Sequence, residues 1–368
     1  MKKPVCLFVI NGMGMGNSTR CYALMQKLAP TMEIHVFTSG NGTMFLQDKK
    51  EVTSLTESEA YFYASKEGGI SAVGTLASIT KLYRIYQRKT KKLDDLVEKL
   101  RPDIMILDSE YSLGPARKRG IPVAALNNSD VVVSDYFRRD DLPSSIRSQF
   151  WLVEFWDYTF HKLRLDMVIS PSLRPDTPRH PNFKRVGVML RTAFEEMARS
   201  TSKDPFPSPR KMKRVVFMLS GSVFASNITG SLSQLPYDVE VVGREGVSEG
   251  SVTYHGKTMN SVDILKNADI LVINGGFLAV SEAAALRKPT FVIPVPNHAE
   301  QVVNAQALKD LGLGYITDEA SVIDQIKRLY EIDRWEGLAT DIPPINFNGS
   351  SEAAEAVMDL LTRSGHGR

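Results

Sequence analysis

Short apolar runs alternate with helix-like amphipathic segments along the whole chain. In the first half, the runs of strand length are Val5–Ile10, Glu33–Ser39, Asp103–Leu107, Pro122–Leu126, Asp166–Ser170 and Arg185–Leu190. The second half repeats the scheme with Arg214–Leu219, Val239–Val242, Ser251–Tyr254, Asp269–Ile273 and Thr290–Val295. Alternation of this kind predicts parallel sheets with helices on both faces. Two such series predict an α/β protein with two doubly wound domains.

A segment rich in proline and charge, residues 171–213, separates the two series and is typical of a linker. We therefore expect a first domain at residues 1–191, a linker at 192–212, a second domain at 213–345 and a final segment at 346–368. The final segment follows a pair of prolines and contains a predicted helix, Glu352–Leu361.

Composition narrows the class of protein. The 368-residue chain is 43% hydrophobic and 24% charged, as expected for a globular protein long enough for two cores. Its formal net charge of +3 is too small to indicate nucleic acid as a partner. Cys6 and Cys21 have apolar neighbours, which favours buried thiols in a reducing compartment over disulfides or a metal site. The N-terminal apolar run is too short for a signal peptide, so we expect a cytoplasmic protein without a transmembrane helix.

The most informative stretch begins where the apolar run Asp269–Ile273 ends. The chain turns at Gly275 and Gly276 and resumes as a helix, starting near Leu278, that carries Glu282. A glycine pair lets the backbone approach a phosphate, and Glu282 could bind the two hydroxyls of a ribose. Taken alone, the same residues could form an ordinary strand-to-helix turn.

The next apolar run, Thr290–Val295, also ends in polar residues that open a helix. They are Glu300, Gln301 and Asn304. Because the carboxyl ends of neighbouring parallel strands meet at one edge of a sheet, the two breaks describe one pocket. At the start of a helix, Glu300 and Gln301 could hydrogen-bond sugar hydroxyls, or they could be exposed helix surface.

Together this passage resembles the nucleotide-sugar site of GT-B glycosyltransferases, especially the branch of the peptidoglycan lipid-intermediate N-acetylglucosaminyltransferase and the UDP-glycosyltransferases. The matching positions are Gly275, Gly276, Glu282, Pro289, Pro294, Glu300, Gln301, Asn304 and Ala305. The resemblance implies a GT-B fold, in which two Rossmann-like domains face a cleft. It also implies that the second domain binds the donor, a UDP-sugar, and that the first binds the acceptor, to which the hexose passes with inversion. The last helix is expected to return to the first domain.

Another glycine-rich turn follows the first apolar run, with Gly12, Gly14 and Gly16 before a helix. It misses the dinucleotide fingerprint because Asn17 stands where the third glycine belongs, and it lacks the lysine of a P-loop. It resembles the first loop of the same glycosyltransferase branch at Gly16, Ser18, Thr19 and Arg20, which makes Gly14 and Gly16 donor-binding candidates.

The same comparison raises a catalytic question at Asn17. In inverting relatives this position holds a histidine that is a candidate base, and an amide accepts no proton near pH 7. In a plain turn, Asn17 or Ser18 would cap the helix.

Carboxylates at the end of the strand Asp103–Leu107 are the other catalytic candidates. Asp108 or Glu110 could take the acceptor's proton, directly or through water, in place of the missing histidine. Asp108 could equally cap the helix that follows Tyr111. Lesser candidates for acceptor contact, after the next strand, are Asn127, Asn128 and Asp130.

Three further features of the second domain point to the donor. Ser220-Gly221-Ser222 resembles the turn that holds the donor diphosphate, so Gly221 and Ser222 are donor-binding candidates. His255 lies where relatives meet the uracil ring, and it could stack on a base or hold a loop. Arg244 could face a phosphate or form a surface ion pair.

Two stretches combine aromatic and basic residues, Thr80–Lys92 and Phe150–Arg164. They suit contact with the inner face of a membrane or with a lipid-phosphate acceptor, or they are core helices with solvated charges. The acceptor is therefore expected to be lipid-linked or a small molecule.

No metal-binding motif such as His-Glu-x-x-His or Asp-x-Asp occurs in the sequence. GT-B enzymes can stabilise the leaving diphosphate with backbone amides and a helix dipole, so we expect a metal-independent enzyme without a cofactor. Two other activities fit the sequence. One is a nucleotide-sugar hydrolase or epimerase on the same fold, and the other is a non-catalytic nucleotide-sugar-binding protein.

Overall fold

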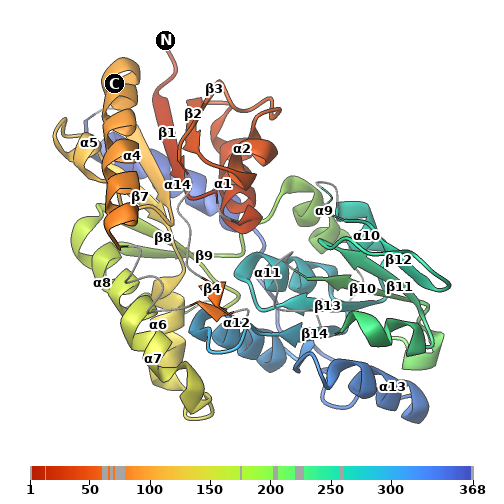
Figure 1. Cartoon of the computed structure of the whole chain (residues 1–368). Coiled ribbons are helices and arrows are strands. Elements are labelled where there is room, and N and C mark those ends of the chain that lie inside the picture. The colour runs from red at the N-terminus through yellow and green to blue at the C-terminus, as the bar shows by residue number, and fades with distance from the viewer. Residues whose placement is uncertain are drawn as a thin grey trace. The chain divides into compact units, whose positions relative to one another are not determined.

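Two parallel β-sheets organise the chain in the computed structural model (Figure 1). The structure describes residues 2–12, 14–59, 65–66, 69–70, 79–174, 176–201, 206–219, 228–256, 258 and 261–365. The chain divides into two compact units, each built on one of these sheets. Unit 1 comprises Met1–Phe137, Val153–Thr192 and Ile345–Arg368, and unit 2 comprises Arg138–Leu152 and Ala193–Pro344.

Within the described residues, unit 1 has a seven-stranded sheet in the order β3-β2-β1-β6-β7-β8-β9, and all neighbouring strands are parallel. Its strands are β1 (Val5–Ile10), β2 (Glu33–Thr38), β3 (Ser54–Glu57), β6 (Ile104–Asp108), β7 (Val123–Leu126), β8 (Met167–Pro171) and β9 (Phe183–Val186). Its helices are α1 (Met15–Leu28), α2 (Asn41–Leu46), α4 (Ile79–Leu100), α5 (Gly114–Arg117), α6 (Ser129–Arg138), α8 (Phe155–Arg164) and α14 (Gly349–Arg363). A separate antiparallel pair consists of β4 (Ser65–Lys66) and β5 (Gly69–Ile70).

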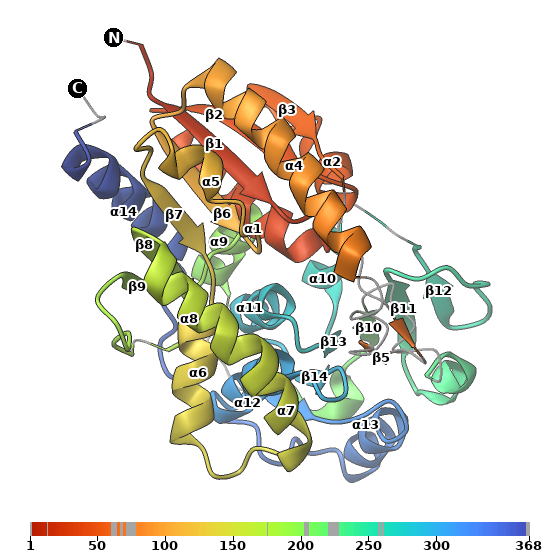
Figure 2. The same cartoon turned by 60° about the vertical axis from the view of Figure 1, so that its left-hand side comes forward.

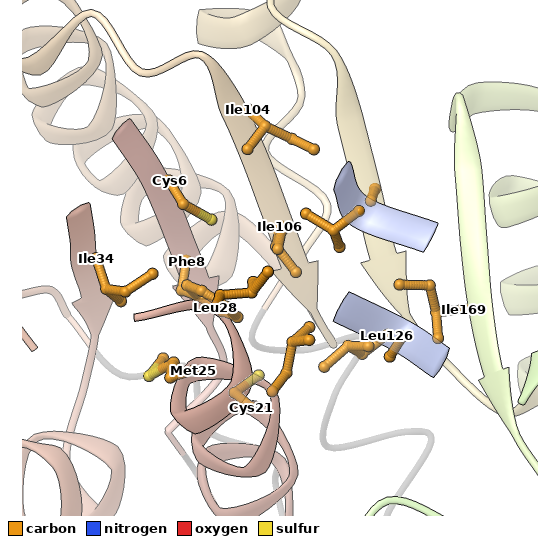
Figure 3. Close-up of a cluster of buried hydrophobic side chains, with 14 of the residues drawn as sticks. Cys6, Phe8, Cys21, Met25, Leu28, Ile34, Ile104, Ile106, Leu126 and Ile169 are labelled. Atoms are coloured by element: carbon orange, nitrogen blue, oxygen red, sulfur yellow. The ribbon is translucent and has the colours of Figure 1, made fainter. Parts of the chain in front are cut away.

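The central strand β1 is buried at every position because both of its faces are covered. Side chains alternate along a strand, so Cys6 and Phe8 enter one core cluster while Leu7 lies on the opposite face. Figure 3 shows part of this cluster, with labelled residues Cys6, Phe8, Cys21, Met25, Leu28, Ile34, Ile104, Ile106, Leu126 and Ile169. Burial raises the pKa of the Cys6 and Cys21 thiols, which therefore stay protonated.

The C-terminal helix α14 belongs to the same unit. Its residues Ala353 and Val357 are part of the cluster around β1 and α1, and the helix contacts β8 and β9. Glu352 accepts a hydrogen bond from the backbone N–H of Gly187 at 2.8 Å. A Cβ on Gly349 would lie 2.0 Å from the backbone oxygen of Gly187, so only glycine lets the helix start this close to the sheet.

Unit 2 has a six-stranded sheet in its described residues, in the order β12-β11-β10-β13-β14-β15, again all parallel. Its strands are β10 (Arg214–Met218), β11 (Asp238–Val242), β12 (Val252–Tyr254), β13 (Ile270–Asn274), β14 (Thr290–Ile293) and β15 (Gly314–Ile316). Its α-helices are α7 (Arg147–Gln149), α9 (Thr192–Ser200), α10 (Val262–Asn267), α11 (Phe277–Leu286), α12 (Ala299–Asp310) and α13 (Val322–Ile332). Short 3-10 turns are η1 (Ser144–Ile146), η3 (Pro209–Lys211) and η5 (Thr229–Gln234), and a π-helical turn, η2 (Phe150–Glu154), crosses the division between the units.

The core of unit 2 lies between one face of this sheet and α13. Phe217 of β10 and Phe291 of β14 are fully buried there, together with Ile326 and Leu329 of α13. The amphipathic pattern of α13, with buried residues three or four positions apart, turns one stripe toward the sheet.

Both sheets follow the same strand order. Counted within each sheet, the order is 3-2-1-4-5-6, with a seventh strand added in unit 1, as in Rossmann folds. The order reverses between β1 and β6 in unit 1 and between β10 and β13 in unit 2. Ligands of such folds bind at the carboxyl ends of the strands near this reversal. The predicted fold class, two doubly wound parallel-sheet domains, is confirmed.

Two segments differ from the domain boundaries that the sequence predicted. Residues 192–212, expected to form a linker, contain α9 and η3, because Phe194 of α9 is buried and gives the helix an apolar anchor. Residues 138–152, expected in the first domain, are assigned to unit 2.

The start of α1 also differs. The helix begins at Met15 with Gly14 at its N-cap and no side-chain capping bond. The prediction that Asn17 or Ser18 caps it is therefore wrong, since both residues lie inside the first turns of the helix.

In the described part of the chain, no helix is both long enough and apolar enough to cross a membrane. The same residues contain no group of three or more His, Cys, Asp and Glu side chains that could hold a metal ion.

Candidate functional site

The predicted glycine pair of unit 2 forms the turn between β13 and α11, and its two members have different roles. A Cβ on Gly275 would lie 2.4 Å from the backbone oxygen of Gln301, so packing against α12 requires glycine there. A Cβ on Gly276, the N-cap of α11, would meet no atom within 4 Å. Gly276 therefore leaves open space at the N-terminus of α11, where backbone N–H groups favour an anion.

Gln301, in the first turn of α12, connects the loop after β13 with the loop after β14. Its Oε1 accepts hydrogen bonds from the backbone N–H of Gly275 at 3.2 Å and of Val295 at 3.0 Å. Because both neighbours are donors, the amide oxygen must face them and Nε2 must point away. Nε2 is therefore the end of the side chain that is left to meet a ligand.

Two more side-chain amides complete the connection. Asn304 Nδ2 donates to the backbone oxygen of Gly275 at 3.0 Å, and Asn274 Nδ2 donates to that of Ile293 at 3.1 Å. Both asparagines are buried. The turns after β13 and β14 are thus fixed to one another, and residues that the sequence assigned to one pocket lie together.

Glu282 and Glu300 lie on the two helices that these turns begin. Glu282 is 3% exposed, on α11, and Glu300 is half-buried in the first turn of α12. Helices α11 and α12 thus begin at the two connected turns, those after β13 and β14, which we call the tied turns. Contact of Glu282 and Glu300 with a donor stays a prediction.

A pocket of about 280 Å³ shares Asn274 and Val295 with the tied turns. Its lining residues are Asn274, Ile293, Pro294, Val295, Pro296, Asp318, Glu319 and Ala320. The pocket lies at the carboxyl ends of β13, β14 and β15. Sequence reasoning missed Asp318 and Glu319, because the short strand β15 before them is only partly apolar and gave no signal.

The remaining donor candidates of unit 2 stand as follows. His255 follows β12, and its Nε2 lies 2.9 Å from Oε2 of Glu240 on β11. Glu240 also pairs with Arg214 Nε at 2.9 Å, so it holds the His255 ring in place. Arg244 follows β11 and is half-buried. Gly221 and Ser222 lie outside the described residues.

At the carboxyl edge of the unit 1 sheet, an arginine holds Asp108. Arg20 Nε donates to Oδ2 at 2.9 Å and Arg20 Nη2 donates to Oδ1 at 2.7 Å. Cys21 Sγ and Ser109 Oγ add further hydrogen bonds. Burial raises the pKa of Asp108, and the guanidinium acts against that shift. Both carboxylate oxygens of Asp108 are thus engaged by the guanidinium of Arg20.

Asp108 does not cap the following helix either. The N-cap of α5 is Leu113, which has no side-chain capping bond. The capping alternative weighed from the sequence is therefore wrong, and the reason is that Arg20 engages both carboxylate oxygens.

Glu110 is also buried, but only one of its oxygens is engaged. Lys89 of α4 pairs with Oε1, whereas Oε2 makes no hydrogen bond within the described residues. Burial raises the pKa of Glu110, and the Lys89 ammonium acts in the opposite direction. A raised pKa makes a carboxylate a stronger base, as general base catalysis requires.

Asn17 lies in the first turn of α1, and its Nδ2 donates to the backbone oxygen of Asn11 at 3.3 Å. The side chain thus holds the glycine turn to the end of β1. A Cβ on Gly14 or Gly16 would meet no atom within 4 Å. Open space therefore lies beside both glycines, as it does beside Gly276.

Among the lesser candidates, Asp130 is fully buried and pairs with Arg185 Nε at 2.8 Å. Asn128 is buried as well. The Asp130 carboxylate therefore ties α6 to β9.

Sequence reasoning missed a fourth carboxylate in this unit, Asp157 of α8. It accepts hydrogen bonds from Tyr111 Oη at 2.7 Å and Asn127 Nδ2 at 2.8 Å, and its Oδ1 lies 3.3 Å from His161 Nδ1. The spacing of Asp157 and His161, four residues apart on one helix, was the available signal.

The tie made by Gln301 can be tested by its contribution to stability. Gln301→Ala leaves the N–H groups of Gly275 and Val295 without an acceptor, which should lower the free energy of unfolding by about 1–3 kcal/mol. Gln301→Glu keeps an acceptor oxygen and should retain most of that stability. Urea denaturation followed by circular dichroism measures both. The matched control is Gln306→Ala on the exposed face of α12, and an equal effect of the two alanine variants would contradict the tie.

Comparison with known proteins agrees with this architecture. The family model of glycosyl transferase family 1 matches residues 5–143 and 211–330. An uncharacterized glycosyltransferase of Methanosarcina mazei is 25% identical over 354 residues, which cover 89% of this chain and 91% of that protein. The UDP-N-acetylglucosamine--N-acetylmuramyl-(pentapeptide) pyrophosphoryl-undecaprenol N-acetylglucosamine transferase of Geobacillus thermodenitrificans is 28% identical over 215 residues, or 51% of this chain and 58% of that protein.

Solved structures share the fold over nearly the whole chain. MurG of Acinetobacter baumannii has a TM-score of 0.58 at 14% identity, covering 97% of this chain and 99% of its own. LpCGTa, solved in complex with UDP, has a TM-score of 0.62 at 16% identity, covering 98% and 99%. At these identities the likeness concerns the fold, which is that of GT-B glycosyltransferases. Together with the two parallel sheets and the family match over both of them, this shows that the chain belongs to glycosyl transferase family 1.

Proposed function

We propose that this glycosyltransferase takes its sugar from a UDP-sugar bound by unit 2 and passes it to an acceptor bound by unit 1. The observation that carries the proposal is the tie made by Gln301, which fixes the turns after β13 and β14 and leaves Gly276 open at a helix N-terminus. LpCGTa was solved with UDP and SsfS6 of Streptomyces with thymidine diphosphate. Those complexes support a nucleoside diphosphate as the leaving group.

Each proposed donor contact follows from the chemistry of the group. Backbone N–H groups at Gly276 and the start of α11 would bind the diphosphate. Glu282 would accept hydrogen bonds from ribose hydroxyls, while Glu300 and the Nε2 of Gln301 would meet hydroxyls of the hexose. Negative charge grows on the diphosphate as its bond to the sugar breaks, so fixed N–H dipoles would stabilise the transition state without a metal ion.

For the acceptor's proton, we propose Glu110 ahead of Asp108. Within the described residues one oxygen of Glu110 makes no hydrogen bond, and burial raises the pKa of this carboxyl, which makes it a stronger base. Asp108 would serve as a structural partner of Arg20. Asn17, in the place of the relatives' histidine, would support the glycine turn and take no proton. Attack by an acceptor hydroxyl on the anomeric carbon, opposite the diphosphate, would invert the configuration.

Release of UDP tests the proposed reaction. Purified protein is incubated with UDP-glucose or UDP-N-acetylglucosamine, with and without a cell extract as the source of acceptor. We expect release that depends on the extract. In Glu282→Ala, the ribose hydroxyls lose a charged acceptor, and UDP binding measured by calorimetry should weaken about 10- to 100-fold.

The alternatives give different results in the same assay. Release without extract would indicate a hydrolase, and binding without release would indicate a nucleotide-sugar-binding protein. Unchanged UDP affinity in a folded Glu282→Ala variant would remove Glu282 from the donor site.

A lipid surface is the proposed location of the acceptor, because exposed apolar side chains lie on η2 and on α8, the helix labelled in Figure 2. Val153, Trp156 and Leu163 are 51%, 65% and 70% exposed, and they lie at helical spacings of three and seven residues. Lys162 and Arg164 adjoin this stripe. Large exposed apolar groups beside basic residues suit an anionic membrane surface.

Co-sedimentation with vesicles tests this location. Wild-type protein should sediment with vesicles that contain phosphatidylglycerol and much less with pure phosphatidylcholine, because Lys162 and Arg164 attract anionic lipid. The double variant Trp156→Ala/Leu163→Ala removes two side chains that would enter the lipid, and its binding should weaken roughly tenfold or more. The control is Val247→Ala, an exposed apolar position of unit 2. Equal binding of all three proteins would refute the lipid surface on α8.

A further inference from the structure

One carboxylate of α8 holds the loops that follow two neighbouring strands of unit 1. Oδ1 of Asp157 accepts a hydrogen bond from Tyr111, which follows β6. Oδ2 accepts one from Asn127, which follows β7. The two donors lie 46 and 30 residues before Asp157 in the chain, so the carboxylate connects segments that are distant in sequence.

His161, one helical turn further along α8, completes the group. Its Nδ1 lies 2.8 Å from the backbone oxygen of Asp157 and 3.3 Å from Oδ1. Both neighbours are acceptors, so Nδ1 carries a proton in either charge state and the titrating proton is on Nε2. When His161 is protonated, its charge compensates the Asp157 carboxylate.

The environment favours this ion pair over two neutral groups. Burial alone would raise the pKa of Asp157, but the His161 charge and the hydrogen bonds of Tyr111 and Asn127 bring it below the usual value. Burial alone would lower the pKa of His161, but Asp157, with a smaller contribution from Asp108, raises it above the usual value. Around the imidazole lie the rings of Tyr111 and Phe160, both at edge-on angles.

The two loops carry groups suited to contact an acceptor. Tyr111 is 45% exposed although its hydroxyl is bound, and its ring packs edge-on against Phe160 at 5.0 Å between centroids. The side chain of Asn127 accepts a hydrogen bond from the backbone N–H of Ser129 at 2.7 Å, which fixes the start of α6. Tyr111 also directly follows Glu110, the proposed base.

We propose that Asp157 is a positioning residue for the acceptor, which fixes the Tyr111 and Asn127 loops through its carboxylate, with His161 as its partner on the same helix. The loops are residues 109–113 and 127–130. Their role toward an acceptor rests on the proposed transfer reaction, whereas their dependence on Asp157 does not.

The pH dependence follows from the two shifts. The pKa of His161 is higher in the folded protein than in the unfolded chain, where it is about 6.5. The charge of His161 therefore stabilises the folded state fully below pH 6.5, and this contribution is lost as pH rises through the folded pKa. The lowered pKa of Asp157 means that its stabilisation is present above the unfolded value of about 3.9 and is lost as pH falls through the folded pKa. The loops should therefore be most ordered between these values and loosen as pH rises above 6.5.

Hydrogen exchange measured by mass spectrometry tests whether Asp157 orders the two loops, and it needs no enzymatic activity. In Asp157→Asn, amides of both loops should exchange about tenfold faster than in wild type, while unit 2 stays unchanged. In His161→Gln, loop protection, corrected for the intrinsic rate, should lose its dependence on pH above 6.5. Tyr111→Phe removes a single hydrogen bond and should loosen only residues 109–113, so the test survives if Asp157→Asn fails to fold. The control is Asp94→Asn, which breaks an exposed pair with Arg119.

The UDP-release assay with extract then tests the role toward the acceptor. Asp157→Asn or Tyr111→Phe should raise the amount of extract needed for half-maximal release severalfold, with UDP affinity unchanged. Loop exchange equal to wild type in both Asp157→Asn and Tyr111→Phe would overturn the proposal. A wild-type protein that releases no UDP would refute the proposed transfer, and the exchange result would still decide the role of Asp157 in the loops.

Discussion

Two hydrogen bonds, from the backbone N–H groups of Gly275 and Val295 to Oε1 of Gln301, are the constraint on which the proposed donor site depends. Parallel strands end in loops that have no ladder partners, so their backbone groups need acceptors from elsewhere. One amide oxygen supplies two of them and thereby couples consecutive β–α turns. Since Gln301 fulfils this role with its oxygen, its Nε2 group points away from both turns, and it is this group that we propose to meet the sugar.

In unit 1, buried carboxylates connect distant segments, as the amide of Gln301 does in unit 2. Asp108, Asp130 and Asp157 each follow or face the carboxyl end of a strand, and each is bound by cations or donors from a distant segment. A buried carboxylate without such partners would be too costly, so these loops are ordered by ion pairs as well as by apolar packing. Glu110 differs because one of its oxygens makes no hydrogen bond within the described residues. For this reason we propose Glu110, ahead of Asp108, as the base.

Much of the fold could be predicted from the sequence because strands buried on both faces are continuous apolar runs, and β1 and β10 begin at the expected residues. The edge strand β3 was missed because Ser54–Glu57 is half-exposed and carries no such run. The residues of the turns after β13 and β14, the proposed donor site, were singled out by their order along the chain. The way Gln301 uses its oxygen, and the group around Asp157, could not be found, because they depend on contacts between segments that only the folded chain brings together.

Calorimetric titration of wild type and Gln301→Glu with UDP and with UDP-N-acetylglucosamine tests the central claim most directly. The glutamate keeps the oxygen that accepts from the Gly275 and Val295 N–H groups and replaces only the Nε2 donor. The new charge repels UDP more than UDP-N-acetylglucosamine, because the terminal phosphate of UDP is more negative, so this effect opposes the predicted result and cannot mimic it. We expect the ratio of UDP-sugar affinity to UDP affinity to fall about tenfold in the variant, which corresponds to the loss of one hydrogen bond to the sugar. An equal loss for both ligands, or no binding of UDP by wild type, would contradict it.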